Sequence, residues 1–336
     1  MAAPHRSLVL IATLAAPIFF GRAQIPVPPE AIGKPVDVPD DLIEAGRRWS
    51  NETQAALLAR GNPHLKISFS FAVLGDSEIG RFPWERMFPP DGDAPRRLLR
   101  SIHDKRPDFI FRLGDMVSEG NVASYREHVA FLEQEARIPV FSIIGNHDRS
   151  RPNGSADKRL YQVVFGKTDF YFDYNGWRFV GLDSSDRLLR NDQLEWLDQA
   201  LDTPQRKIIF THVPPFFIKG KLSHCPPRAL AIENVAALGY WKDFMTGFFK
   251  RGSPEFEEIA ARRGVERVYM GHIHAFGMAD HRGTRYILSG GGGSPLYFMP
   301  GDMPQCRITH FLEVSAGPGP IGETGHFLDG GSFSLP

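Results

Sequence analysis

Residues 138–148 read IPVFSIIGNHD and place three polar side chains directly after an apolar run. The run is rich in β-branched and aromatic residues and stops at Gly145, which predicts a buried strand. Asn146, His147 and Asp148 follow without a spacer. A buried strand with such residues at its carboxyl end indicates a ligand site at the edge of a sheet.

The same arrangement occurs four more times along the chain. The segments are LGDSE with Asp76, LGDMV with Asp115, FTHVP with His212, and MGHIH with His272 and His274. Any one of them alone reads equally well as a helix cap or a hydrogen-bonded polar residue. The carboxyl ends of parallel strands share one edge, so we expect all five to converge. Carboxylate, carboxamide and imidazole ligands without cysteine suit ions such as Zn, Mn or Fe.

Strand-like and helix-like segments alternate around these motifs, which predicts an α/β fold with a largely parallel sheet. Asn175-Gly176 between two short apolar runs predicts a hairpin. We expect strands at 67–75, 107–114, 138–145, 170–174, 177–184, 207–214, 265–271, 284–290 and 307–315. We expect helices at 96–104, 123–137, 192–201 and 254–264.

The expected domain organisation is a signal peptide (1–23), an N-terminal arm with one helix (24–66), one catalytic domain (67–315) and an irregular tail (316–336). The stretch 216–250 follows no simple period and is interpreted as an insertion near the site. Its aromatic residues would stack a base, line a pocket or form the core of the insertion. They are Phe216, Phe217, Tyr240, Trp241, Phe244, Phe248 and Phe249.

Composition and the N-terminus bear on location and partners. The 39 basic and 39 acidic residues cancel, so the chain has no overall field that favours nucleic acid or an anionic membrane. Residues 1–23 have a basic start, an apolar stretch and small residues near Ala23, which predicts a signal peptide and a secreted or periplasmic protein. The stretch is shorter than the roughly 20 residues that span a bilayer, so a retained anchor is the less favoured alternative. After export, Cys225 and Cys306 would pair or remain separate thiols.

With these motifs the chain resembles a known family, the calcineurin-like metallophosphoesterases. That family carries Asp-x-His, Gly-Asp-x-x, Gly-Asn-His-Asp/Glu, His and Gly-His-x-His at successive strand ends. The resemblance covers residues 67–315, and four of the five blocks are intact. It implies a four-layer α/β/β/α sandwich with two mixed sheets and two divalent or trivalent metal ions (Fe, Mn or Zn) in its cleft.

The resemblance also implies a role for each matching residue. One ion would take Asp76, Asp115 and His274, and the other Asp115, Asn146, His212 and His272. His147 would face the substrate as a proton donor, and Asp148 would orient it. Arg149 is a further candidate for contact with a phosphate. The loop SGGGGSPLY (289–297) resembles one in exported members of the family, and we interpret its glycines as a tight turn beside the cleft.

Two departures from the family pattern concern the first ion. Glu78 stands where the family has His, and Ser118 stands where the related purple acid phosphatases have a ligating tyrosine. No purple colour is therefore expected. Glu78 would either bind the ion or leave that position to water. We expect the second arrangement, because Asp76, Asp115 and His274 already anchor the ion and a hydrolase needs an open position.

Two ions about 3.5–4 Å apart suit the hydrolysis of phosphate esters by a metal-bound hydroxide. We therefore expect an exported hydrolase of small-molecule phosphate esters, with monoesters favoured as substrates. A phosphodiesterase of nucleotides or lipids is the alternative on the same site. A non-catalytic binding protein with a weakened first metal site is the alternative from another class. We expect no nucleic-acid partner beyond nucleotides and no stable membrane insertion.

Overall fold

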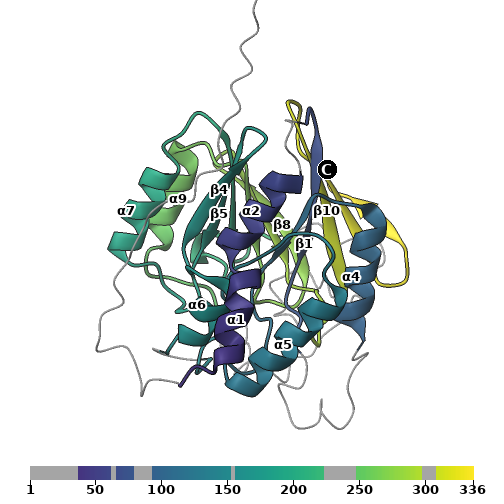
Figure 1. Cartoon of the computed structure of the whole chain (residues 1–336). Coiled ribbons are helices and arrows are strands. Elements are labelled where there is room, and N and C mark those ends of the chain that lie inside the picture. The colour runs from purple at the N-terminus through teal and green to yellow at the C-terminus, as the bar shows by residue number, and fades with distance from the viewer. Residues whose placement is uncertain (1–36, 62–65, 79–92, 153–155, 223–246, 297–307) are drawn as a thin grey trace, which may run out of the picture.

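The computed structural model describes residues 37–61, 66–78, 93–152, 156–222, 247–296 and 308–336. In this part of the chain, two six-stranded sheets pack against each other and helices lie on the outside (Figure 1). Both sheets contain parallel and antiparallel pairs, so the predicted sandwich with two mixed sheets is confirmed. Among the described helices, none combines the length and the apolar run that a bilayer span requires.

The first sheet has the strand order β12-β11-β10-β1-β2-β3. Its strands are β1 (Phe69–Leu74), β2 (Phe109–Arg112), β3 (Val140–Ser142), β10 (His310–Ala316), β11 (Gly322–Phe327) and β12 (Ser332–Ser334). β1, β2 and β3 run parallel, whereas β10, β11 and β12 add antiparallel neighbours. The carboxyl ends of β1, β2 and β3 therefore share one edge.

The second sheet has the order β4-β5-β6-β7-β9-β8. Its strands are β4 (Phe170–Tyr174), β5 (Trp177–Leu182), β6 (Arg206–Thr211), β7 (Arg267–Met270), β8 (Phe276–His281) and β9 (Thr284–Ser289). β5, β6, β7 and β9 are parallel, and β4 and β8 close the two sides as antiparallel strands. The predicted hairpin between β4 and β5 is confirmed, and both Asn175 and Gly176 have the positive φ that its two-residue turn requires.

Helices cover the outer faces of the two sheets. On the side of the first sheet lie α4 (Ala94–Lys105) and α5 (Val122–Glu135), and α1 (Asp40–Trp49) and α6 (Arg159–Phe165) pack together with α5. α2 (Asn51–Gly61) lies beside β3 and contributes Ala55 and Leu58 to the core between the sheets. On the side of the second lie α7 (Asn191–Ala200), α9 (Ser253–Arg262) and the short 3₁₀ turn η2 (Phe216–Ile218). In Figure 1, α7 and α9 stand together on one side and α4 on the other.

Alternation along β1 explains why this strand reads as one apolar run. Phe69, Phe71 and Val73 lie in the aromatic core between the sheets. Ala72 and Leu74 point the other way and pack in the core with α4. Successive side chains of a strand face opposite sides of the sheet, so a sheet covered on both faces needs apolar residues at most positions.

The core between the sheets also aligns the strand ends that carry the polar motifs. Phe111 of β2 and Phe210 of β6 stack with their ring centroids 3.6 Å apart and nearly parallel. Asp115 and His212 follow these two residues along their strands. The stack therefore fixes the distance between two motifs that come from different sheets.

The N-terminal arm contains two helices where one was predicted. Ser50 has an extended backbone (φ −60°, ψ 144°) that separates α1 from α2. At the start of α2, Asn51 exchanges two hydrogen bonds with the backbone of Ser142, at 2.9 and 3.0 Å. Gln54 accepts a further one from the Val140 amide. The arm thus covers the open edge of β3, whose backbone groups would otherwise be exposed to pairing.

The prediction of an irregular tail at 316–336 was wrong, because β11 and β12 lie there and extend the first sheet. Glu323 on β11 is 5% exposed and accepts a hydrogen bond of 2.6 Å from the Tyr269 hydroxyl of the second sheet. It also pairs with Arg267 at 3.1 Å. These strands are rich in glycine and polar residues, so they show no apolar period in the sequence. Much of their stabilisation comes from backbone pairing and from the polar contact between the two sheets.

Candidate metal centre

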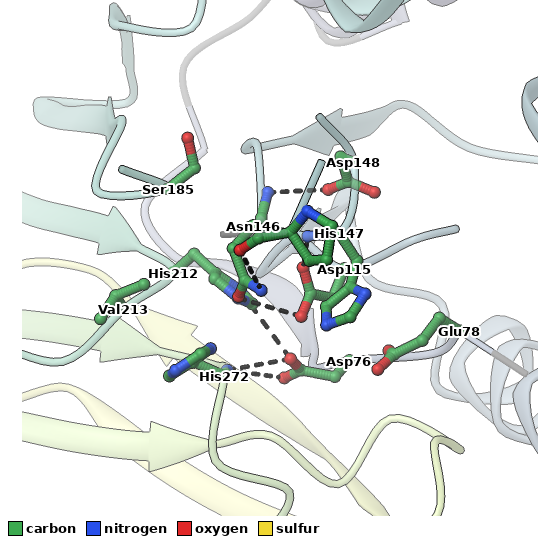
Figure 2. Close-up of polar contacts among 12 residues, drawn as sticks. Asp76, Glu78, Asp115, Asn146, His147, Asp148, Ser185, His212, Val213 and His272 are labelled. Carbon is green, nitrogen blue, oxygen red and sulfur yellow. Dashed lines mark hydrogen bonds and ion pairs between the residues drawn. The ribbon is translucent and has the colours of Figure 1, made fainter. Parts of the chain in front are cut away.

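The polar motifs converge where the strand ends of the two sheets meet. Asp76 follows β1, Asp115 follows β2, Asn146–Asp148 follow β3, His212 follows β6, and His272 and His274 follow β7. Figure 2 shows side chains from both sheets turned toward a common centre. The expected convergence of the six predicted ligands is therefore what the structure shows, and all six are at most 5% exposed.

One group of ligand atoms contains Asp76, Glu78 and His274, whose ligand atoms all lie within 4.8 Å of one another. The His274 Nε2 is 3.7 Å from an Asp76 oxygen and 3.3 Å from Glu78 Oε1. The backbone amide of His272 donates to both Asp76 oxygens at 2.9 and 3.0 Å, which orients this carboxylate. Glu78 is thus placed beside the other two ligands rather than turned away from them.

A second group contains Asp115, His212 and His272, within the same limit of 4.8 Å. The His212 Nε2 lies 3.2 Å from Asp115 Oδ2 and 3.1 Å from Asn146 Oδ1. The second carboxylate oxygen of Asp115 accepts the amide of His147 at 2.8 Å. Asn146 therefore joins this second group, as the motif pattern implies.

Backbone carbonyls orient two of the imidazoles. The Nδ1 of His212 donates to the Leu113 carbonyl at 2.7 Å, and the Nδ1 of His274 donates to the Pro295 carbonyl at 2.6 Å. The Nε2 of each ring then faces the carboxylates, where it would bind an ion once its proton is displaced. Such carbonyl partners fix the tautomer of a metal-binding histidine, and sequence reasoning could not find them because any residue supplies a carbonyl.

Glycine before a ligand is required by close backbone approach at this centre. A Cβ on Gly145 would lie 2.2 Å from both the amide nitrogen and Oδ1 of Asp115. Gly114 in addition has a φ of +88°, and a Cβ there would lie 2.7 Å from the Gly145 nitrogen. The Gly-Asp and Gly-Asn pairs of the sequence thus reflect two loops packed backbone against backbone.

Charge is distributed unequally over the buried ligands. Burial opposes ionisation of Asp115, but the His212 and His147 imidazoles hold the pKa of this carboxyl well below its usual range. Burial raises the pKa of Asp76 to about 8. Burial also opposes charge on the two histidines, yet nearby carboxylates raise the pKa of His212 to about 10 and that of His274 to about 9. Without metal, Asp76, His212 and His274 thus hold protons at pH 7.

Metal binding at pH 7 should therefore release protons. The ligands bind as carboxylate and neutral imidazole, so the protons on Asp76, His212 and His274 must leave. Since their pKa values lie above 7, apparent affinity should fall as the pH is lowered from 8 toward 6, by up to about tenfold per unit for each proton displaced. Calorimetric titration of Zn²⁺ into metal-free protein in two buffers of different ionisation enthalpy measures the release. Heats that do not depend on the buffer would contradict this expectation.

Two buried atoms of the cluster have no hydrogen-bond partner, and both suit a cation. Nε2 of His272 has none, and Oε1 of Glu78 has only its ion pair with His274. A buried polar atom without a partner costs free energy, typically about 1–3 kcal/mol. The donor set of carboxylates, imidazoles and one carboxamide fits Fe, Mn or Zn. The residues present therefore fit a metal centre with two adjacent positions.

His147 lies beside the ligand groups, but its predicted partner is wrong. The imidazole Nδ1 is 3.0 Å from the Ser118 carbonyl oxygen. The Asp148 carboxylate instead accepts amide hydrogens, from Gly145 at 2.7 Å and from Met116 at 2.8 Å. Asp148 therefore joins the loops after β2 and β3, and the carbonyl of Ser118 orients the imidazole.

Arg149 is not placed as an open phosphate contact. It is 1% exposed, its Nη1 forms an ion pair with Asp186, and its Nη2 donates to the Pro152 carbonyl at 3.0 Å. Its Nε donates to the Asn146 carbonyl at 3.3 Å. Through these contacts Arg149 stabilises the loop that carries Asn146.

The described ends of the insertion 216–250 are joined beside β6. The Phe249 amide donates to the Pro214 carbonyl and the Phe216 amide to the Phe249 carbonyl, both at 2.9 Å. Phe248 and Phe249 are buried in the core under α9, so these two aromatics are structural. Tyr240, Trp241, Phe244 and both cysteines lie outside the described residues, and their predicted roles stay predictions.

The fold and the centre together define a metal-dependent hydrolase. Residues 69–276, more than half of the chain, match the family of calcineurin-like phosphoesterases. The chain belongs to this family and is a hydrolase of phosphoric esters, which confirms the resemblance inferred from the motifs.

Individual relatives add detail. A probable cyclic nucleotide phosphodiesterase of Synechococcus sp. is 28% identical over 218 residues, 62% of this chain and 72% of the relative. A similarly named protein of Fibrobacter succinogenes is 28% identical over 129 residues, 37% of this chain and 50% of the relative. The purple acid phosphatase of yellow lupin (Lupinus luteus) has a TM-score of 0.58 at 15% identity and covers 80% of this chain. This chain spans only 53% of the lupin protein, and the likeness concerns the fold alone.

Proposed function

We propose that this protein hydrolyses small phosphodiesters with two metal ions held by the strand-end cluster, chosen from Fe, Mn and Zn. The observation that carries the proposal is the pair of adjacent, buried ligand groups around Asp76 and Asp115, with His147 beside them. Family membership favours this enzyme over the non-catalytic binding protein.

When bound, two such ions supply Lewis acidity to the phosphoryl oxygens and activate the attacking water. The chain's own part is to hold the ligands in place and to supply a proton. Because Nδ1 of His147 donates to the Ser118 carbonyl, Nε2 is the nitrogen that gives a proton to the leaving oxygen, and the ring does so as imidazolium. The deep burial of the cluster strengthens each of these electrostatic interactions.

The choice of diesters rests on the relatives. Both curated relatives described above are named as probable cyclic nucleotide phosphodiesterases, and the Synechococcus protein aligns over most of its length. The preference for monoesters drawn from the sequence has no comparable support, but nothing contradicts it. Hydrolysis of monoesters and hydrolysis of diesters would use the same centre, so only measured rates on both kinds of substrate distinguish them.

The test is a substrate panel with the full-length protein and added Mn²⁺ or Zn²⁺. It compares bis(p-nitrophenyl) phosphate and 3′,5′-cyclic AMP with p-nitrophenyl phosphate and 5′-AMP. Higher kcat/KM for the diesters supports the proposal, and higher values for the monoesters would restore the first preference. Bound metal without turnover of any substrate would argue for the binding protein.

We also propose that the protein is exported, on the basis of residues 1–23 alone. These residues lie outside the described part of the chain. Sequencing the N-terminus of protein recovered from the medium or periplasm tests the proposal, with Gln24 expected as the first residue. Recovery of the uncleaved chain from the cell would refute it.

A further inference from the structure

Glu78 occupies the position at which the chain departs from the family pattern. It is 2% exposed, and its Oε1 forms an ion pair with Nε2 of His274 at 3.3 Å. Oε2 accepts the hydroxyl of Ser294 at 2.5 Å. One carboxylate oxygen is thus held by Ser294, while the other lies against a neighbouring ligand, within reach of an ion that His274 would bind.

Ser294 ties the Gly-rich loop to the strand end that carries the ligands. Its amide donates to the Asp76 carbonyl at 3.2 Å, and its hydroxyl also lies 3.0 Å from the Glu78 carbonyl. The loop reaches this position only because of its glycines. A Cβ on Gly292 would lie 2.4 Å from the carbonyl oxygen of Gly75. The run interpreted as a simple turn is therefore packed directly against the segment from Gly75 to Glu78.

We propose that Glu78 is a ligand of the first metal ion and that Ser294 is the residue that positions it. The proposal rests on the dinuclear centre proposed above, and it replaces the expectation that water fills this position. Glu78 Oε1, Asp76 and His274 would share one ion, with the hydroxyl of Ser294 fixing which carboxylate oxygen faces it. The ligand atoms of these three residues all lie within 4.8 Å of one another, close enough to hold one ion between them.

This assignment makes the two metal positions chemically different. The first group has two carboxylates and one imidazole, and the second has one carboxylate and two imidazoles together with Asn146. Carboxylate ligands suit Mn²⁺, whereas imidazoles suit Zn²⁺ and Fe²⁺. We therefore expect the first position to prefer Mn²⁺ and the second to prefer Zn²⁺.

The test is metal binding rather than activity. Metal-free wild type and variants are titrated with Mn²⁺, with free Mn²⁺ read by electron paramagnetic resonance, and then with Zn²⁺, with bound metal measured after dialysis. Glu78→Ala should weaken one Mn²⁺ equivalent by about 100-fold and leave the other ion in place. Ser294→Ala should weaken the same equivalent by about tenfold. Glu78→His should shift the preference of that position from Mn²⁺ to Zn²⁺.

Controls keep the result interpretable. Ser315→Ala removes an exposed hydroxyl of β10 that bonds the Gly322 carbonyl, and it should bind both ions as wild type does. Glu78→Gln keeps the size of the side chain if the alanine variant fails to fold, and it should also lose affinity for one ion. Circular dichroism of each metal-free variant checks the fold.

The outcomes separate this inference from the proposed function. Wild-type protein that binds neither Mn²⁺ nor Zn²⁺ would refute the metal-dependent function itself. Two ions in wild type and unchanged affinities in both Glu78→Ala and Glu78→Gln would overturn only the assignment of Glu78. Loss of both ions together in these two folded variants would also overturn it, because Glu78 would then support the whole centre.

Discussion

Asp115→Asn should leave the protein without both metal ions and without measurable hydrolysis. Asp115 is buried and contacts His212 at 3.2 Å, and it is the carboxyl that the surrounding imidazoles hold ionised. The family pattern assigns this carboxylate to both ions, and the amide that replaces it carries no charge with which to hold either of them. We expect affinity for each ion to fall by more than about 100-fold, the upper range for loss of a merely supporting partner. Metal content after dialysis and kcat/KM for an aryl phosphate diester measure the effect.

A matched control distinguishes loss of a carboxylate shared by both ions from loss of any other carboxylate. Asp202→Asn removes an exposed partner of Arg263 on the surface and should change neither metal content nor rate. If Asp115→Asn keeps one ion at full affinity, Asp115 binds only one of the two ions and its assignment to both is wrong. Near-ultraviolet circular dichroism must show that the variant is folded.

His147→Ala should separate turnover from metal binding. We expect two bound ions and a kcat lower by roughly 10²–10⁴, the usual contribution of a general acid. The residue approaches the cluster through its backbone amide, which donates to Asp115 at 2.8 Å and which alanine retains. The alanine variant should therefore keep the hydrogen bond from the backbone amide of residue 147 to the Asp115 carboxylate.

The dependence on leaving group tests how His147 acts. The loss of rate should shrink for p-nitrophenolate, which leaves without a proton, and be greatest for alkyl esters. Equal losses for both classes would mean that the ring stabilises charge rather than donating a proton. His281→Ala is the control and should leave kcat unchanged. It removes an imidazole at the end of β8 that pairs with Glu257 of α9 at 2.7 Å.

The ligands of the site could be predicted from the sequence, whereas the groups that orient them could not. Asp76, Asp115 and His212 were found because each follows an apolar strand, and parallel strands bring their carboxyl ends together whatever the distance in sequence. The partner of His147 could not be found, because it is the carbonyl of Ser118 and carries no sequence signal. Asp148 was given that task only because it is adjacent in sequence.

The fold was predicted best for the long apolar strands of the core and worst for short elements and for the strands at the sides of the sheets. The strands of the core between the sheets appeared as continuous apolar runs, whereas α6, β8, β11 and β12 were missed. β8 has the sequence FGMADH and is the last strand of the second sheet, where it pairs with β9 alone among the described strands. A short strand that mixes small, polar and apolar residues shows no clear period, even where most of its residues are buried, as in β8.

The C-terminal strands have a consequence for anyone who shortens this chain. Residues 317–336 look dispensable, yet a chain that stops at Ala316 would expose the hydrogen-bonding row of β10 along its whole length. It would also leave the buried Tyr269 hydroxyl without its acceptor, Glu323. An open edge of this kind pairs with other copies of itself, and the expected product is an aggregate rather than a slightly weaker enzyme. A tag for purification is therefore better added after Pro336 than substituted for the residues before it.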